Sequence, residues 1–280
     1  MRKVLIRCFF VGAAFAVAGC ETVSTVSPRV AEVEDDSAGT QAVNIQSLTE
    51  VVSRNPTDAQ AYNTRGAAYA RVGRYREAIQ DFDKAVQLNP NLAAAYTNRA
   101  LAHRQTNRND QALADFNRAI SADPNYGPAY VGRANLLRVQ GDLQTAFSDL
   151  NSAIRLNPEN AQAFHARGLL YQRQNQHDFA ISDFDAAIDR DPYAAAPYQA
   201  RGQSLIATNK FEKAIEDFNA ALNVDNRNGD AWAGRGLAYE RMGRRQDATE
   251  SYQRALTADP SNAAARAGNA RLGGGGFFRG

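Results

Sequence analysis

The sequence predicts an all-α protein, a solenoid of six helix hairpins, from three observations that share one spacing. Proline recurs every 34 residues, at Pro56, Pro90, Pro124, Pro158, Pro192 and Pro260, with Asn226 in the remaining place. When each repeat is counted from three residues after this position, its fourth residue is aromatic and its eighth is small in every case. Alanine fills positions 20 and 27 throughout. A fixed period of this length is typical of helical repeat proteins.

The six repeats run over residues 59–92, 93–126, 127–160, 161–194, 195–228 and 229–262. Small residues at positions 8 and 20 let two antiparallel helices approach closely, and large residues at positions 4 and 24 fill the space beside them. Position 15 is Gly73, Asn107, Gly141, Asn175, Asn209 or Gly243, which tolerate the left-handed conformation that ends a helix. This pattern resembles the tetratricopeptide repeat (TPR). The resemblance implies a right-handed α–α superhelix of about six TPR hairpins with flanking helices.

The first residues predict a secretory signal, residues 1–19. Arg2, Lys3 and Arg7 stand around the start of a short apolar run that ends in small residues. The sequence Val17 to Cys20 resembles the bacterial lipobox, which implies cleavage before Cys20 and acylation of its thiol. The alternative is an ordinary signal peptide with an incidental cysteine. In lipoproteins of this type an aspartate after the cysteine retains the protein at the inner membrane, so Glu21 favours the outer membrane, with the protein facing the periplasm of a bacterial envelope.

The segments beside the repeats have simpler compositions. Residues 20–41 are expected to comprise the acylated cysteine and a flexible tether, because residues 21–41 carry five acids and one base. We expect the solenoid to occupy residues 42–272, with one extra helix over residues 44–54, a capping helix over residues 263–272 and fourteen helices in all. The glycine-rich residues 273–280 predict a disordered tail, in which Phe277 and Phe278 are either inert or a small docking element.

The charge balance argues against nucleic acid as a partner. The chain has 32 basic and 30 acidic side chains, and removal of the signal leaves 29 against 30. Residues 42–280 retain a net charge of +3, which is too dilute for a basic stripe. Cys8 leaves with the signal and Cys20 is the lipidation site, so the processed chain has no free thiol for catalysis.

An arginine stands at position 7 of every repeat: Arg65, Arg99, Arg133, Arg167, Arg201 and Arg235. Position 23 is aspartate in the first five repeats and Ser251 in the last. A row of arginines can bind phosphates or carboxylates. Because positions 7 and 23 lie beside the close contact of the two helices, we expect instead a structural ladder of arginine–aspartate pairs.

The TPR resemblance implies that ligands bind in a concave groove lined by the first helices. Positions 2, 5, 6, 9, 12 and 13 face it, and the candidate partner-binding residues there are Asn63, Arg71, Asn98, Arg104, Asn135, Arg138, Arg173 and Arg241. Such a polar, mildly basic groove suits an extended peptide with acidic side chains or a free carboxylate. The alternative is a solvated face whose arginines aid solubility. Only Asn98 matches the carboxylate clamp of chaperone-binding TPR domains, which argues against that particular chemistry.

No catalytic pattern is visible, and we expect no enzyme activity, no metal and no cofactor. His103, His165 and His177 fall in different helices, and no glycine-rich phosphate loop or nucleophile–base pair occurs. The predicted function is a membrane-anchored scaffold or adaptor that binds protein partners, similar in layout to NlpI-type outer-membrane lipoproteins. Two alternatives stay open: a pilotin or outer-membrane assembly factor with a secretin subunit as partner, and an enzyme with a site between repeats. The partner, the pathway and the oligomeric state do not follow from the sequence.

Overall fold

The computed structural model describes residues 38–273, and these residues form fourteen helices and no strand. The helices are α1 (Ala38–Arg54), α2 (Ala59–Arg71), α3 (Tyr75–Leu88), α4 (Ala93–Gln105), α5 (Asn109–Ala122), α6 (Gly127–Gln140), α7 (Leu143–Leu156), α8 (Ala161–Arg173), α9 (His177–Arg190), α10 (Ala195–Ala207), α11 (Phe211–Val224), α12 (Gly229–Arg241), α13 (Arg245–Ala258) and α14 (Ala263–Arg271). Six hairpins, from α2–α3 to α12–α13, coincide with the six predicted repeats. The predicted all-α solenoid is confirmed.

Each hairpin turns where the sequence predicts it. The residue at position 15 has a positive φ in all six repeats; these residues are Gly73, Asn107, Gly141, Asn175, Asn209 and Gly243. Side chains at several helix starts accept backbone N–H groups, as Asp58 does from Gln60 at 2.8 Å. Pro128 lies in the first turn of α6, where no intrahelical donor is lost.

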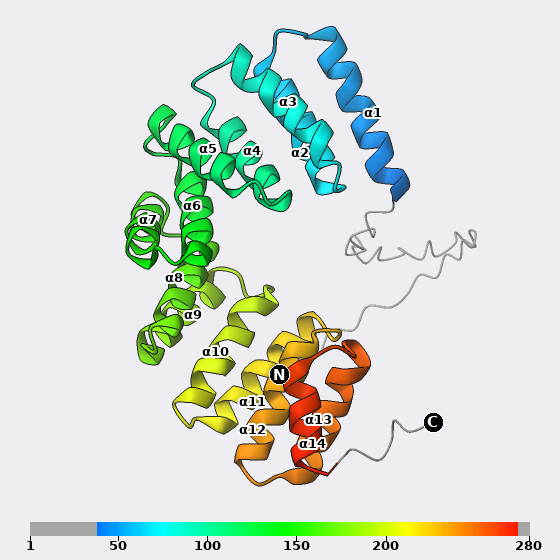
Figure 1. Ribbon diagram of the computed structural model, residues 1–280, viewed down its shortest axis with the longest axis vertical. Coiled ribbons are helices and arrows are strands. Elements are labelled where there is room, and N and C mark those ends of the chain that lie inside the picture. The colour runs from blue at the N-terminus through cyan, green and yellow to red at the C-terminus, as the bar shows by residue number, and fades with distance from the viewer. Residues whose placement is uncertain (1–37, 274–280) are drawn as a thin grey trace, which may run out of the picture.

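The hairpins are arranged in two layers that curve into an open crescent (Figure 1). The first helices of successive repeats, α2, α4, α6, α8, α10, α12 and finally α14, contact one another in order. Among the described residues, the second helices contact first helices and never one another. A layer whose members touch is shorter than a layer whose members spread apart, so the first helices form the inner, concave wall.

The core follows from the repeat pattern. The large residue at position 24 is fully buried in each repeat, as Phe82, Phe116, Leu150, Phe184, Phe218 and Tyr252. It packs against the small residue at position 8: a Cβ added to Gly66 would lie 2.7 Å from Cε1 of Phe82. A side chain there would force the two helices apart, and overpacking of a dense core is destabilising.

Both flanking helices are present, with one difference in extent. Helix α14 follows the predicted cap closely, whereas α1 begins at Ala38 and so includes residues 38–41, which the sequence assigned to the tether. Residues 38–41 contain no proline, so α1 extends through them. The predicted signal, Cys20, most of the tether and Phe277 with Phe278 lie outside the described residues.

Candidate partner-binding groove

The ladder of arginine–aspartate pairs is confirmed and holds each hairpin together. In the first five repeats, Nε and Nη2 of the position-7 arginine donate to both carboxylate oxygens of the position-23 aspartate at 2.6–2.8 Å; the pairs are Arg65–Asp81, Arg99–Asp115, Arg133–Asp149, Arg167–Asp183 and Arg201–Asp217. This two-point geometry is the strongest that an arginine makes with a carboxylate. The hydrogen bonds to Asp149 raise the pKa of Arg133, so the guanidinium stays protonated.

The same arginines also join successive hairpins, a contact that the sequence reasoning missed. Nη1 donates to position 25 of the preceding repeat: Arg99 to Asp83 at 2.7 Å, Arg133 to Asn117 at 2.7 Å, Arg167 to Asn151 at 2.8 Å, Arg201 to Asp185, and Arg235 to Asn219 at 2.9 Å. A signal existed, because position 25 is Asp or Asn in the first five repeats. The position-7 arginines thus join the two helices of a hairpin and also link successive hairpins along the solenoid.

The last rung of the ladder differs. Ser251 replaces the aspartate, and its hydroxyl lies 3.2 Å from Nε of Arg235. Burial lowers the pKa of Arg235, which has Ser251 and Asn219 in place of a hydrogen-bonded aspartate. The guanidinium instead lies over the Trp232 ring, with Cζ 4.2 Å from the ring centroid. The cation of the sixth repeat is held by an aromatic face and an amide rather than by an ion pair.

At the N-terminal end of the groove, the two candidate asparagines pair with each other. Nδ2 of Asn98 donates to Oδ1 of Asn63 at 2.9 Å, across the contact between α2 and α4. Asn63 is only 5% exposed. The pair therefore joins two first helices, and Asn63 offers little surface to a ligand. Arg71 lies exposed at the end of α2.

The middle of the groove brings together four of the candidates. Arg104, Asn135 and Arg138 line one hollow of about 550 Å³ with His165, Gln162 and apolar groups. Nη1 of Arg173 donates to the backbone oxygen of Arg138 at 2.5 Å, which draws the Arg173 side chain toward α6. Burial, and then the positive charges of Arg173 and Arg104, lower the pKa of Arg138. Three cations thus gather on three consecutive first helices.

Among the described residues, no carboxylate forms an ion pair with these cations. Within residues 45–273, Arg104, Arg138 and Arg173 have no ion pair, and Nε of Arg138 is buried without a hydrogen-bond partner. The one acidic residue that lines the hollow is Asp191, whose Oδ1 accepts the backbone N–H of Tyr193 at 3.2 Å. The middle of the groove is therefore a positively charged hollow.

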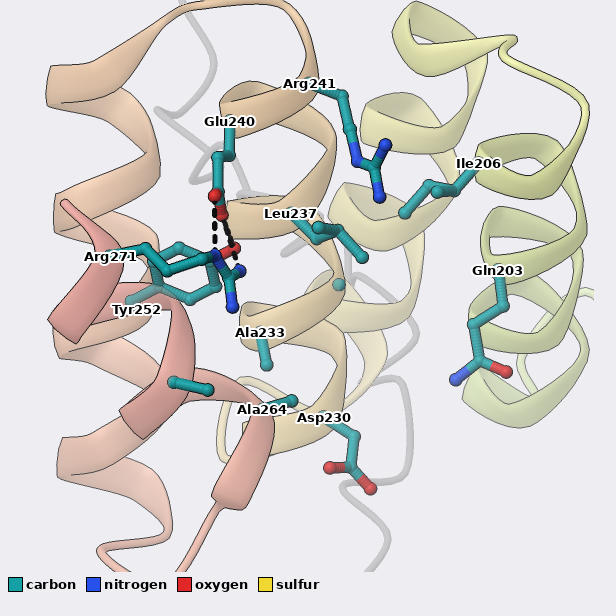
Figure 2. A pocket seen from close by; sticks show the side chains of 12 residues that line it. Gln203, Ile206, Asp230, Ala233, Leu237, Glu240, Arg241, Tyr252, Ala264 and Arg271 are labelled. Carbon is teal, nitrogen blue, oxygen red and sulfur yellow. Dashed lines mark hydrogen bonds and ion pairs between the residues drawn. The ribbon is translucent and has the colours of Figure 1, made fainter.

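The C-terminal end of the groove has a different character (Figure 2). A hollow of about 1050 Å³ lies between α10, α12 and α14, and Arg241 projects into it from the end of α12. Glu240 accepts two hydrogen bonds from Arg271 at 2.8 Å and one from the Tyr252 hydroxyl at 2.5 Å. The bonds to Arg271 lower the pKa of Glu240, which stays ionised. The Glu240 carboxylate thus links α12 to α13 and to the capping helix α14.

The contact of Glu240 with Tyr252 and Arg271 does not follow from the repeat pattern, because Arg271 lies beyond the last full repeat. The middle hollow also has an apolar lining that was not predicted, which includes Val139 at 70% exposed. Val139 stands at position 13 of the third repeat, a position that is arginine in three other repeats, so the repeat pattern does not distinguish Val139 as a groove residue.

Two further properties of the described part of the chain bear on function. In residues 38–273, no cluster of three or more His, Cys, Asp or Glu side chains has the arrangement to hold a metal ion. Over the same range, none of the helices combines the length and the apolar character that crossing a bilayer requires.

Family models match most of the solenoid. Models of the tetratricopeptide repeat match residues 59–92, 93–126, 161–193 and 229–262, and a TPR repeat model matches residues 134–175 and 202–243. The chain belongs to the tetratricopeptide repeat family. TPR proteins are typically scaffolds for protein–protein interaction rather than catalysts, and the fold of this TPR protein is that of such a scaffold.

Solved structures share the TPR fold. The Cut9–Hcn1 complex of the APC/C has a chain similar over 84% of this one, with a TM-score of 0.76 and 18% identity; the match spans 46% of that longer chain. PilF of Pseudomonas aeruginosa has a TM-score of 0.69 at 16% identity, covering 78% of this chain and 99% of PilF. PilW, a type IV pilus biogenesis factor, has a TM-score of 0.67 at 16% identity, covering 75% and 97%. A search of curated proteins found no match.

Proposed function

We propose that this TPR protein is a membrane-anchored scaffold that binds protein partners in a bacterial envelope through its concave groove. The observation that carries the proposal is the unbalanced charge in the middle of the groove. An ion-paired wall would be a structural surface, whereas Arg104 and Arg138 line a hollow without an ion pair among the described residues, and Arg173 lies beside Arg138. Charged donors on a rigid concave wall suit an extended segment of a partner protein.

The anchor is proposed from the sequence. Acylation of Cys20 would hold the chain at a membrane through several acyl chains, and each buried methylene adds about 0.8 kcal/mol. Glu21 favours the outer membrane. The acidic residues between Cys20 and the solenoid would act as a spacer. Anchoring raises the local concentration of a partner captured by the groove, without any additional contact.

A second candidate function is assembly of a pilus or secretin. The support is the fold similarity to PilF and PilW, which extends over nearly the whole of both proteins. The two candidates differ in the partner, since the second requires a secretin or pilus subunit in the groove. They share the anchor and the docking surface.

The anchor is tested with Cys20→Ser in the full chain. We expect wild type to carry acyl chains and to fractionate with outer membranes, and the variant to lose both properties. An acylated, membrane-bound Cys20→Ser variant would contradict the anchor.

The docking surface is tested with a photo-crosslinker. Val139 lies in the middle of the groove, and Phe179, 63% exposed on the outer helix α9, provides a matched control site. In cells, the probe at Val139 should capture a defined envelope protein that the probe at Phe179 does not. Capture of a secretin or pilus subunit favours the second candidate, and equal capture at both sites contradicts docking in the groove.

A further inference from the structure

The three arginines of the middle groove come from three successive first helices. Arg104 and Arg138 occupy position 12 of successive repeats, on the adjacent helices α4 and α6. Arg173 comes from the next first helix, α8, but its hydrogen bond to the Arg138 carbonyl brings it back toward Arg138. The cations therefore form two centres: Arg104 alone, and Arg138 with Arg173.

The distance between the two centres follows from helix packing. Packed helices lie about 8–10 Å apart. A polyproline II segment rises about 3.1 Å per residue with three residues per turn, so side chains three residues apart lie on one face at about 9 Å. In a β-strand, side chains three residues apart point to opposite faces. The spacing of the centres thus fits carboxylates three residues apart on a polyproline II segment.

The surrounding groups suit such a segment. Gln162, Asn135 and His165 add hydrogen-bonding side chains, while Val139, Leu169 and Pro197 provide apolar surface. A polyproline II backbone has no internal hydrogen bonds, so its carbonyls are available to side-chain amides. Proline rings between the two carboxylates would contact the apolar part of the lining.

We propose that the middle groove recognises a polyproline II segment of a partner protein carrying two acidic residues three positions apart, one at Arg104 and the other at Arg138 and Arg173. This inference rests on the proposed docking function of the groove. It adds the chemistry and the register of the occupant. The carboxylates would relieve the repulsion among the three cations.

The test compares two blocked peptides of equal composition, PEPPEP and PPEEPP, binding to the purified solenoid at low ionic strength. Both carry two glutamates and favour polyproline II, but only the first has the three-residue spacing. We expect PEPPEP to bind several-fold more tightly. Arg104→Gln and Arg138→Gln should each weaken it about tenfold, the change that corresponds to loss of a charge-assisted hydrogen bond.

Arg76→Gln is the matched control, because Arg76 is an exposed arginine on the outer helix α3, away from the groove. It should leave PEPPEP binding unchanged, and melting curves confirm that every variant is folded. Equal affinity for the two peptides, equal losses in all three variants, or no binding of either peptide would overturn the proposal. Inorganic phosphate that binds as tightly as PEPPEP and displaces it would also overturn it, in favour of a small-anion site.

This outcome is distinguishable from failure of the proposed function. If the crosslinker at Val139 captures a partner whose contact segment has no acidic residues at this spacing, the groove is a docking surface and the inference about its occupant is wrong. If Val139 and Phe179 capture the same proteins, docking in the groove itself fails.

Discussion

Two sets of arginines occupy the same first helices in opposite electrostatic environments. Arg133 and Arg138 both belong to α6, yet Arg133 has a carboxylate at 2.7 Å and Arg138 has none within the described residues. The pKa of Arg133 is raised by its aspartate, while burial and neighbouring cations lower that of Arg138. The difference separates two roles on one helix: the ladder holds the solenoid together, and the middle groove retains unbalanced charge for a ligand.

The largest expected effect comes from breaking a rung. Asp149→Ala leaves Arg133 without its carboxylate in a pair whose aspartate side chain is 5% exposed. Loss of one partner of a buried pair costs about 3–5 kcal/mol, and we expect about 3 kcal/mol in the free energy of unfolding, measured by denaturant titration. Asp189→Ala, at an exposed position of α9, is the control and should change stability little. Equal losses in the two variants would contradict the ladder.

The incomplete rung sharpens the comparison. Arg133→Leu removes a cation that holds two carboxylate bonds, whereas Arg235→Leu removes one held by Ser251, Asn219 and the Trp232 ring. We expect Arg133→Leu to lower the free energy of unfolding by about 2 kcal/mol more than Arg235→Leu does. Similar losses would show that the aspartates contribute nothing beyond packing.

Completing the last rung is expected to have a smaller effect of opposite sign. Ser251→Asp places a carboxylate next to Arg235 Nε and restores the pattern of the other five repeats. We expect a gain of about 1 kcal/mol, seen as a higher melting temperature. Ser251→Asn, with similar volume and no charge, should give no gain; if it stabilises as much, the charge is not the cause.

The smallest expected effect concerns pH. Burial lowers the pKa of His103 and of His165, so the unfolded chain binds more protons than the folded chain below the ordinary imidazole pKa of about 6.5. Stability should therefore fall as the pH is lowered through this value. His103→Leu, which places the residue found in repeats three and five at this position, should reduce the loss between pH 7 and pH 5. An unchanged pH profile would exclude His103 as a contributor.

The repeat period predicted most of the fold, because each hairpin is set by local residues that recur at fixed positions. The hairpins, the turns at position 15 and the ladder pairs all depend on contacts within one repeat. The contact from Arg99 to Asp83 joins two repeats, so a comparison of positions inside one repeat could not reveal it.

The groove was harder to predict than the hairpins. Asn63 and Asn98 share a hydrogen bond because two neighbouring helices happen to present amides, and Arg173 turns toward Arg138 because a backbone carbonyl is available there. Both outcomes depend on side-chain conformations across helices. The repeat positions that face the groove include Arg104, Arg138 and Arg173, but position alone does not show which arginines form ion pairs and which do not.

The most direct test of the two roles uses two substitutions on one helix, Arg133→Gln and Arg138→Gln, with two measurements on each. Denaturant titration gives stability, and PEPPEP titration gives the affinity of the folded protein. We expect Arg133→Gln to lower the free energy of unfolding by about 2–3 kcal/mol with little loss of affinity, and Arg138→Gln to weaken binding about tenfold with stability unchanged or slightly raised. If Arg138→Gln destabilises the protein as much as Arg133→Gln, or binds the peptide as well as wild type, the separation of the two sets is contradicted.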